Sequence, residues 1–166
     1  MKYFLYRGVM PVLSVCLFLF VSACTDNPVG EGDHHDDHAE VNGLELVSGT
    51  TVVFRVLDGQ VSCDAPPCGI TLRLGEPSST FEVHFLDDEG NEVHAEDLDA
   101  AFSLSFLVAA PEVASLEKLG DWSIKATAAS VGATRIQLNL DHEGHPDFTT
   151  PPLANSDAIS ITVVAP

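Results

Sequence analysis

Hydrophobic and polar residues alternate with a period of two along most of the chain after residue 44. Seven segments carry this alternation, and they cover residues 52–57, 70–74, 81–85, 102–108, 122–127, 134–140 and 159–163. Such alternation is typical of strands with one buried face, and the Gly, Pro and Asp clusters between the segments are typical of turns. The pattern predicts one all-β domain over residues 44–166, an antiparallel β-sandwich or barrel of about seven to nine strands.

The N-terminal segment has a different pattern. Lys2 and Arg7 precede a run of 13 residues, 9–21, that is apolar apart from Pro11 and Ser14. A membrane span needs roughly 20 apolar residues, so this run is too short to be one. A short positive region followed by a short apolar region is typical of a secretory signal peptide, which we place at residues 1–23.

The end of this segment, Val21-Ser22-Ala23-Cys24, resembles the bacterial lipobox, with Val in place of the usual Leu. The resemblance implies cleavage before Cys24 and acylation of its sulfur and amino group, including a palmitate-type chain. The mature protein would then be held in the cell envelope, at the outer membrane or a periplasm-facing membrane, because several acyl chains give stable anchoring. The alternative is an ordinary signal for soluble secretion.

Charge narrows the class of partner. Loss of Lys2 and Arg7 with the signal peptide leaves five basic against 25 acidic residues, a formal charge of −20. A surface this acidic repels nucleic acid and attracts cations, so we exclude DNA and RNA as partners. Residues 24–43 are acidic and poor in large apolar side chains. This composition predicts a disordered tether between the lipid and the domain.

Two cysteines remain after the signal peptide and Cys24 are set aside. Cys63 and Cys68 flank Asp64-Ala65-Pro66-Pro67, a turn-forming sequence. An even pair in an exported protein predicts a disulfide. A redox pair and a pair of thiolate metal ligands are the alternatives, although the spacing matches neither Cys-x-x-Cys nor a four-ligand zinc pattern.

The second half of the chain, roughly residues 100–165, resembles bacterial immunoglobulin-like domains. The resemblance rests on four segments, Pro111-Glu112-Val113-Ala114-Ser115, Trp122-Ser123-Ile124-Lys125-Ala126, Val131-Gly132-Ala133-Thr134-Arg135-Ile136 and Ile159-Ser160-Ile161-Thr162-Val163. It implies an immunoglobulin-like sandwich. That fold serves many functions, so the resemblance says little about activity.

The seven histidines fall into three groups, and the first group lies in the tether. His34, His35 and His38 stand among aspartates in Asp33-His34-His35-Asp36-Asp37-His38. Imidazoles and carboxylates at this density bind Zn²⁺, Cu²⁺ or Ni²⁺. We treat this group as a secondary metal site. The alternative is a solvated spacer whose histidines are incidental.

The second group is a pair on a predicted hairpin. A three-residue loop, Asp88-Glu89-Gly90 with Gly90 left-handed, pairs Phe85 with Val93 and His84 with His94. Directly opposite residues have Cβ atoms about 5 Å apart, close enough for two imidazoles to share one metal ion. Val83 and Phe85, on either side of His84, are expected to face the core. His84 and its partner His94 should therefore both point away from the core. The alternative is a surface pair with no ligand.

The third group follows a predicted strand. His142 and His145 lie three apart in Asp141-His142-Glu143-Gly144-His145-Pro146-Asp147, at the start of an expected long loop. If this group meets the hairpin pair, His84, His94, His142 and His145 supply four imidazoles, enough for a tetrahedral Zn²⁺ or Cu²⁺ site. The alternative is a polar turn with exposed histidines.

These observations predict a cell-envelope lipoprotein that binds zinc or copper, for buffering or for delivery to a metal transporter or another surface protein. The alternative is an immunoglobulin-like surface interaction or structural module with no metal role. We do not expect an enzyme, because the sequence carries no Gly-x-Ser-x-Gly, phosphate-binding Gly-rich or His-Glu-x-x-His motif.

Overall fold

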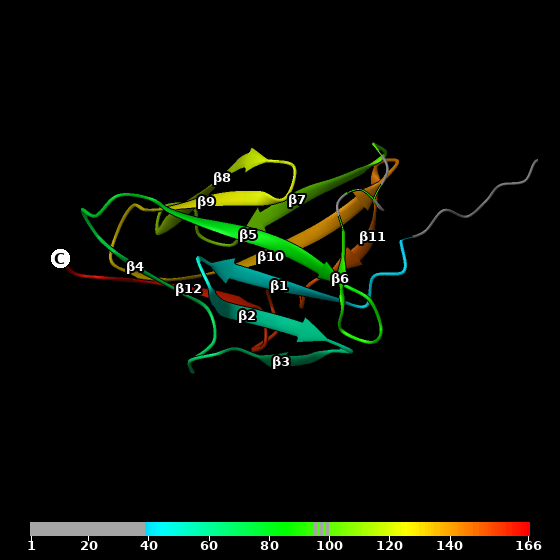
Figure 1. Cartoon of the computed structure of the whole chain (residues 1–166). Coiled ribbons are helices and arrows are strands. Elements are labelled where there is room, and N and C mark those ends of the chain that lie inside the picture. The colour runs from blue at the N-terminus through cyan, green and yellow to red at the C-terminus, as the bar shows by residue number, and fades with distance from the viewer. Residues whose placement is uncertain (1–38, 95, 97, 99) are drawn as a thin grey trace, which may run out of the picture. The chain divides into compact units, whose positions relative to one another are not determined.

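The computed structural model describes residues 39–94, 96, 98 and 100–166. Over these residues the chain folds as strands and turns without a helix, in two layers that form a β-sandwich (Figure 1). The described part of the chain therefore contains no helix able to cross a membrane. The predicted signal peptide, Cys24 and the tether histidines His34, His35 and His38 lie outside the described residues.

The first sheet has seven strands in the order β3-β2-β1-β5-β9-β8, with β6 also paired to β5. Its strands are β1 (Gly43–Ser48), β2 (Thr51–Leu57), β3 (Gln60–Ser62), β5 (Ser79–Leu86), β6 (Glu92–Val93), β8 (Ala114–Gly120) and β9 (Ser123–Ala128). All of its ladders are antiparallel. We call this layer sheet A.

The second layer, sheet B, has five strands in the order β11-β10-β12-β4, with β7 also paired to β10. Its strands are β4 (Ile70–Arg73), β7 (Phe102–Val108), β10 (Gly132–His142), β11 (His145–Thr149) and β12 (Ile159–Val164). The last strand, β12, lies between β10 and β4, and it pairs with β4 in parallel. This parallel ladder is the one departure from the antiparallel sandwich expected from the sequence, among the residues described.

All seven strands expected from alternation are present, as β2, β4, β5, β7, β9, β10 and β12. The all-β sandwich is therefore confirmed, but it has twelve described strands, more than the seven to nine expected. The folded part also begins earlier than Leu44. Gly43 already belongs to β1, and Ala39 and Val41 pack against the core, so these residues are structured although they fall within the range expected to be a tether.

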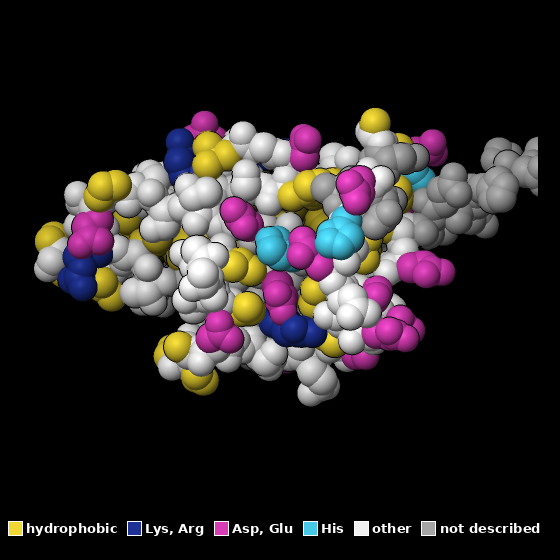
Figure 2. All heavy atoms as spheres, viewed as in Figure 1, with side chains coloured by type: hydrophobic (Ala, Val, Ile, Leu, Met, Phe, Trp, Pro, Cys, Tyr) yellow, Lys and Arg dark blue, Asp and Glu magenta, His cyan; other side chains and the backbone are white. Residues whose placement is uncertain are grey.

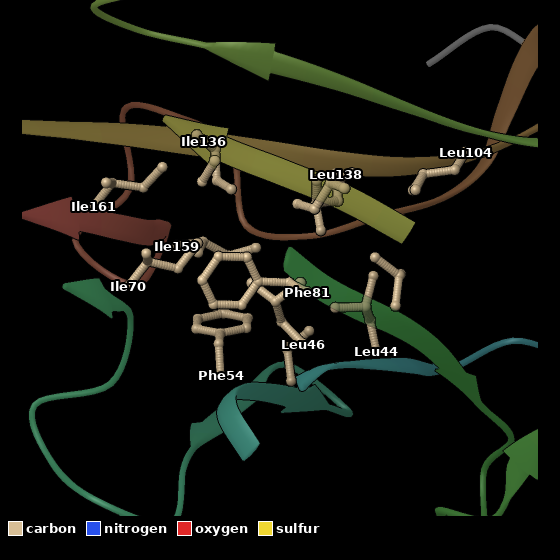
Figure 3. Close-up of a cluster of buried hydrophobic side chains, with 14 of the residues drawn as sticks. Leu44, Leu46, Phe54, Ile70, Phe81, Leu104, Ile136, Leu138, Ile159 and Ile161 are labelled. Carbon is tan, nitrogen blue, oxygen red and sulfur yellow. The ribbon is translucent and has the colours of Figure 1, made fainter. Parts of the chain in front are cut away.

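The core fills the space between the two sheets (Figure 3). Its largest fully buried side chains are Phe54, Phe85, Leu44, Leu46, Ile70, Ile124, Ile136, Leu138, Leu140, Ile159, Ile161 and Val163. The alternating residues of facing strands meet there, as the period-two pattern requires. Two buried threonines are also satisfied: Thr134 Oγ1 accepts from the Ala110 amide at 2.8 Å, and Thr150 Oγ1 accepts from the Leu138 amide at 3.0 Å.

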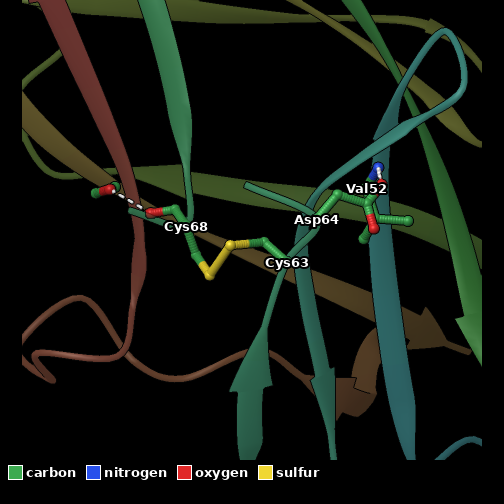
Figure 4. The surroundings of a disulfide bond; sticks show 5 residues. Val52, Cys63, Asp64 and Cys68 are labelled. Atoms are coloured by element: carbon green, nitrogen blue, oxygen red, sulfur yellow. Dashed lines mark hydrogen bonds between the residues drawn. A yellow bond between two sulfur atoms is a disulfide. The ribbon is translucent and has the colours of Figure 1, made fainter. Parts of the chain in front are cut away.

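The predicted disulfide is confirmed: Cys63 and Cys68 are bonded, with Cα atoms 5.4 Å apart (Figure 4). The loop that it closes is held to β2 at both ends. The Val52 amide donates to Asp64 Oδ2 at 2.7 Å, and the Gly69 amide donates to the Val53 carbonyl at 2.8 Å. Gly69 has φ of 130°, and a Cβ there would lie 2.6 Å from the Ser160 carbonyl oxygen, so this position requires glycine.

Removal of this disulfide should destabilise the domain modestly. The bond closes a loop of only six residues, for which the loss of unfolded-state entropy corresponds to about 2 kcal/mol. The double variant Cys63→Ala/Cys68→Ala should therefore unfold about 2 kcal/mol more easily in a urea titration. A loss well above 4 kcal/mol would contradict this, and would show that the bond does more than close a short loop.

Candidate functional site

The four histidines predicted in the domain lie in two pairs, one on each sheet. His84 and His94 belong to the β5–β6 hairpin of sheet A, and His142 and His145 belong to the β10–β11 hairpin of sheet B. Phe85 points into the core, where its ring centroid lies 6.3 Å from that of Phe148 in β11. Successive side chains of a strand point to opposite faces, so His84 points away from sheet B. The structure does not bring the two pairs together.

The β10–β11 hairpin has a two-residue turn. Glu143 and Gly144 both have positive φ, 49° and 90°, as a type I′ turn requires. His142 and His145 are therefore directly opposed across the ladder. The sequence predicted a long loop starting here, but residues 145–149 form β11 and continue the sheet.

A β-bulge in this hairpin places a carboxylate beside the histidine pair. The ladder pairs Asp141 with Pro146 and Leu140 with Phe148, so Asp147 is the extra residue on β11. Bulges change the direction of a side chain relative to regular pairing. The side chain of Asp147 is only 4% exposed. Sequence reasoning missed this residue. Pro146 was the available signal, since proline within a sheet marks an edge strand or a bulge.

Both imidazoles face the Asp147 carboxylate. His142 Nδ1 lies 3.9 Å from Oδ2, and His145 Nδ1 lies 3.9 Å from Oδ1. The Ala39 amide also donates to Oδ2, at 3.3 Å. His142 stacks on Phe102, with ring centroids 4.3 Å apart, and its side chain is 12% exposed, whereas that of His145 is 60% exposed. One imidazole is therefore fixed by packing and the other stands at the surface.

Two imidazoles and one carboxylate are a donor set suited to Zn²⁺ or Cu²⁺. Ligand atoms about 2.0–2.1 Å from a tetrahedral metal ion lie about 3.3 Å from one another. The nitrogen–oxygen distances in the hairpin are 3.9 Å and the two imidazole centroids lie 6.2 Å apart, so all three side chains would have to move closer together to share an ion. Among the described residues, as they are placed, no group of three or more His, Cys, Asp or Glu could hold a metal ion.

The histidine pair of sheet A has a different geometry. Phe85 pairs with Val93 as predicted, and β6 ends there, so His94 follows the strand as an exposed residue. His84 Nε2 lies 3.6 Å from Glu82, and its Nδ1 lies 3.4 Å from Glu92. The two carboxylates thus face different nitrogens of one ring. A single ion bound to His84 would reach one of them but not both, so this pair is the weaker metal candidate.

The turn that joins β5 and β6 matches its prediction. Gly90 has φ of 81°, and the Asp87 amide donates to the Asn91 carbonyl at 2.9 Å. The carboxylate of Asp87 accepts from the side chain of Asn91 at 3.1 Å and from its amide at 2.8 Å. These hydrogen bonds, chiefly the one from the Asn91 side chain, hold the pKa of Asp87 below 3.8, the ordinary value of an aspartate.

Substitution of Asn91 should shift this titration. In Asn91→Ala the pKa of Asp87 should rise toward 3.8 but remain below it, because the residue 91 amide still donates. The folded pKa is the lower one, so the stabilisation exists above pH 3.8 and is lost as pH falls through the folded value. NMR titration of the carboxyl carbon measures the change. An unchanged pKa in the variant would contradict the assigned cause.

Known proteins add little to this picture. No protein-family model and no curated protein sequence matches the chain. Among solved structures, domains 5–6 of the S-layer protein SbsC align over 61% of this chain and 41% of that one, with 16% identity and a TM-score of 0.41. Domains 4 and 5 of the same protein align over 75% and 77%, with 14% identity and a TM-score of 0.41. The chain thus spans less than half of the first of these structures.

Proposed function

We propose that this chain is a cell-envelope lipoprotein whose β-sandwich domain binds Zn²⁺ or Cu²⁺ at the β10–β11 hairpin, for buffering or for delivery to a transporter or another surface protein. One observation carries the metal assignment. The Nδ1 atoms of His142 and His145 each lie 3.9 Å from an oxygen of the same nearly buried carboxylate, Asp147. No enzymatic reaction is part of this proposal.

The chemistry of the hairpin favours a cation. The Asp147 carboxylate is nearly buried and accepts a hydrogen bond from the Ala39 amide, and it could also serve as an oxygen ligand to a divalent ion. The imidazoles supply neutral nitrogen ligands of the kind that zinc and copper prefer. The acidic balance of the chain, 25 Asp and Glu against seven Lys and Arg, concentrates cations near the surface.

The tether histidines extend this proposal. His34, His35 and His38 precede Ala39 by one to five positions, and the Ala39 amide donates to Asp147 of the hairpin. A His- and Asp-rich composition of this kind binds transition-metal ions with moderate affinity and little selectivity. The hairpin, with one imidazole fixed by stacking on Phe102, is the site of higher affinity.

Zinc titration calorimetry tests the metal site. The protein would be residues 24–166 with Cys24→Ser and with His34, His35 and His38 changed to alanine, so that the tether cannot bind zinc through imidazole. We expect one saturable site per chain with Kd tighter than about 10 μM, or −7 kcal/mol. If this variant shows no saturable binding tighter than that, the hairpin site is ruled out.

Metabolic labelling tests the lipid anchor separately. The full chain expressed in a bacterium should incorporate labelled palmitate and partition with detergent, because two or more acyl chains give stable membrane attachment. The variant Cys24→Ala should incorporate none and remain in the aqueous phase. Labelling that persists in the variant would refute acylation at Cys24, whatever the outcome of the zinc titration.

A further inference from the structure

A notch opens in sheet A along one edge of β5. On one side of β5, β1 pairs with it continuously from Glu82 to Leu86. On the other side, β9 pairs with residues 79–82 and β6 pairs with residues 85–86. The Val83 amide also donates to the Trp122 carbonyl at 2.9 Å, so the unpaired edge of β5 is confined to the position of His84, between Trp122 and β6. A pocket of about 190 Å³ lies at this position.

The floor of the notch is aromatic and apolar. Trp122 and Phe85 line it, and their rings meet edge to face with centroids 5.4 Å apart. Leu98, which is buried, lines it as well. Aromatic faces attract cations that lie within about 6 Å of the ring centroid, and tryptophan does so most strongly.

The rim of the notch is acidic. Glu82 and Glu92 line it on either side of His84, with side chains 67% and 45% exposed. Figure 2 shows acidic and histidine side chains gathered over β5 and β6 on this face. The nearby cation, Arg55, is already paired with Glu45 of β1. Two carboxylates above an aromatic floor are complementary to a positively charged group.

The size of the notch limits what it can hold. Sites for drug-sized ligands and cofactors have volumes of about 300–1,000 Å³. The notch, at about 190 Å³, is smaller than this. One long side chain fits this space, whereas a cofactor does not.

We propose that this notch binds an arginine side chain of a basic partner protein, independently of the metal site. A guanidinium is planar, stacks on aromatic faces and donates to two carboxylates at once, whereas a lysine ammonium is a compact point charge. Glu82 and Glu92 would accept its hydrogen bonds, and the face of Trp122 would contact its plane. The notch is thus an interaction surface for a partner opposite in charge to this chain.

The chain's single tryptophan makes this testable with the signal-free protein. The probe is the tripeptide acetyl-Gly-Arg-Gly-amide, titrated while the indole N–H resonance of Trp122 is followed by NMR. We expect a saturable shift with Kd in the millimolar range, and about tenfold weaker binding of the same peptide with citrulline, the neutral isostere of arginine. The lysine peptide should also bind more weakly than the arginine peptide.

A matched pair of charge variants completes the test. Glu82→Gln/Glu92→Gln should weaken arginine binding about tenfold. Glu76→Gln/Glu112→Gln removes the same number of charges at positions outside the notch. This variant should bind the arginine peptide with an affinity within about twofold of that of the unchanged protein. The chemical shift of the Trp122 indole N–H in the absence of peptide and the thermal melting temperature check that each variant is folded. Equal binding of arginine and citrulline peptides, equal loss in both charge variants, or no indole shift up to 20 mM peptide would each overturn the proposal.

Discussion

Replacement of His145 with alanine should weaken zinc binding at the hairpin by about 100-fold or more. Loss of a residue that merely orients a metal ligand costs about 10–100-fold in affinity, so loss of a ligand itself should cost at least as much. His145 is the appropriate target because its side chain is 60% exposed. Its removal takes away one nitrogen donor and little packing. The measurement is zinc calorimetry on the protein with the tether histidines replaced.

The sheet A pair provides the matched control. His94→Ala removes an exposed histidine of the other hairpin and should leave zinc affinity unchanged within about twofold. Asp147→Asn keeps the volume of the third donor but removes its charge, and it should also weaken binding strongly. If His94→Ala lowers the affinity as much as His145→Ala does, the metal lies elsewhere and the hairpin assignment fails.

Replacement of Phe54 with alanine should destabilise the domain by about 3–5 kcal/mol. Phe54 lies in β2 between the two sheets and is 1% exposed. The change removes a buried aromatic ring from the core and leaves a cavity in its place. Neighbouring strands cannot fill this cavity, since the hydrogen-bonded ladders fix the positions of both sheets. Guanidinium unfolding followed by tryptophan fluorescence measures the loss.

A surface leucine gives the comparison for this prediction. Leu107 in β7 is 52% exposed, and Leu107→Ala should change stability by no more than about 0.5 kcal/mol. The contrast separates burial from loss of apolar volume as the cause. A loss below about 1 kcal/mol in Phe54→Ala would mean that the two sheets do not close on a shared core.

Strands with one buried face and one solvent-exposed face are predicted from the sequence. Strands that lack a regular alternation of this kind are missed. β1 was not identified because only Leu44-Glu45-Leu46 alternates before a bulge between Leu46 and Val47 interrupts the period. β8 is mostly exposed and carries Glu117 and Lys118, which hide its pairing with β9. The short strands β3 and β6 have too few residues for any periodicity.

The candidate site was predicted in part for a similar reason. The spacing of His142 and His145 pointed to a shared turn, and the type I′ turn at Glu143 and Gly144 places them opposite each other. Asp147 was not identified because a bulge decides where it points, and a bulge depends on the ladder that forms around it. The distance between the two hairpins depends on how the sheets stack, which local pattern does not encode.

The position of β12 has a consequence for how the protein is made. This strand joins β10 to β4 at the centre of sheet B, and Ile70 pairs with Ile161 across 91 positions of the chain. Pairings between residues so far apart in sequence slow folding, because the entropy of closing the loop is lost before the stabilising contacts form. Sheet B stays divided until residues 159–164 have been synthesised. The strands synthesised earlier must therefore wait for residues 159–164 before β4 can join sheet B.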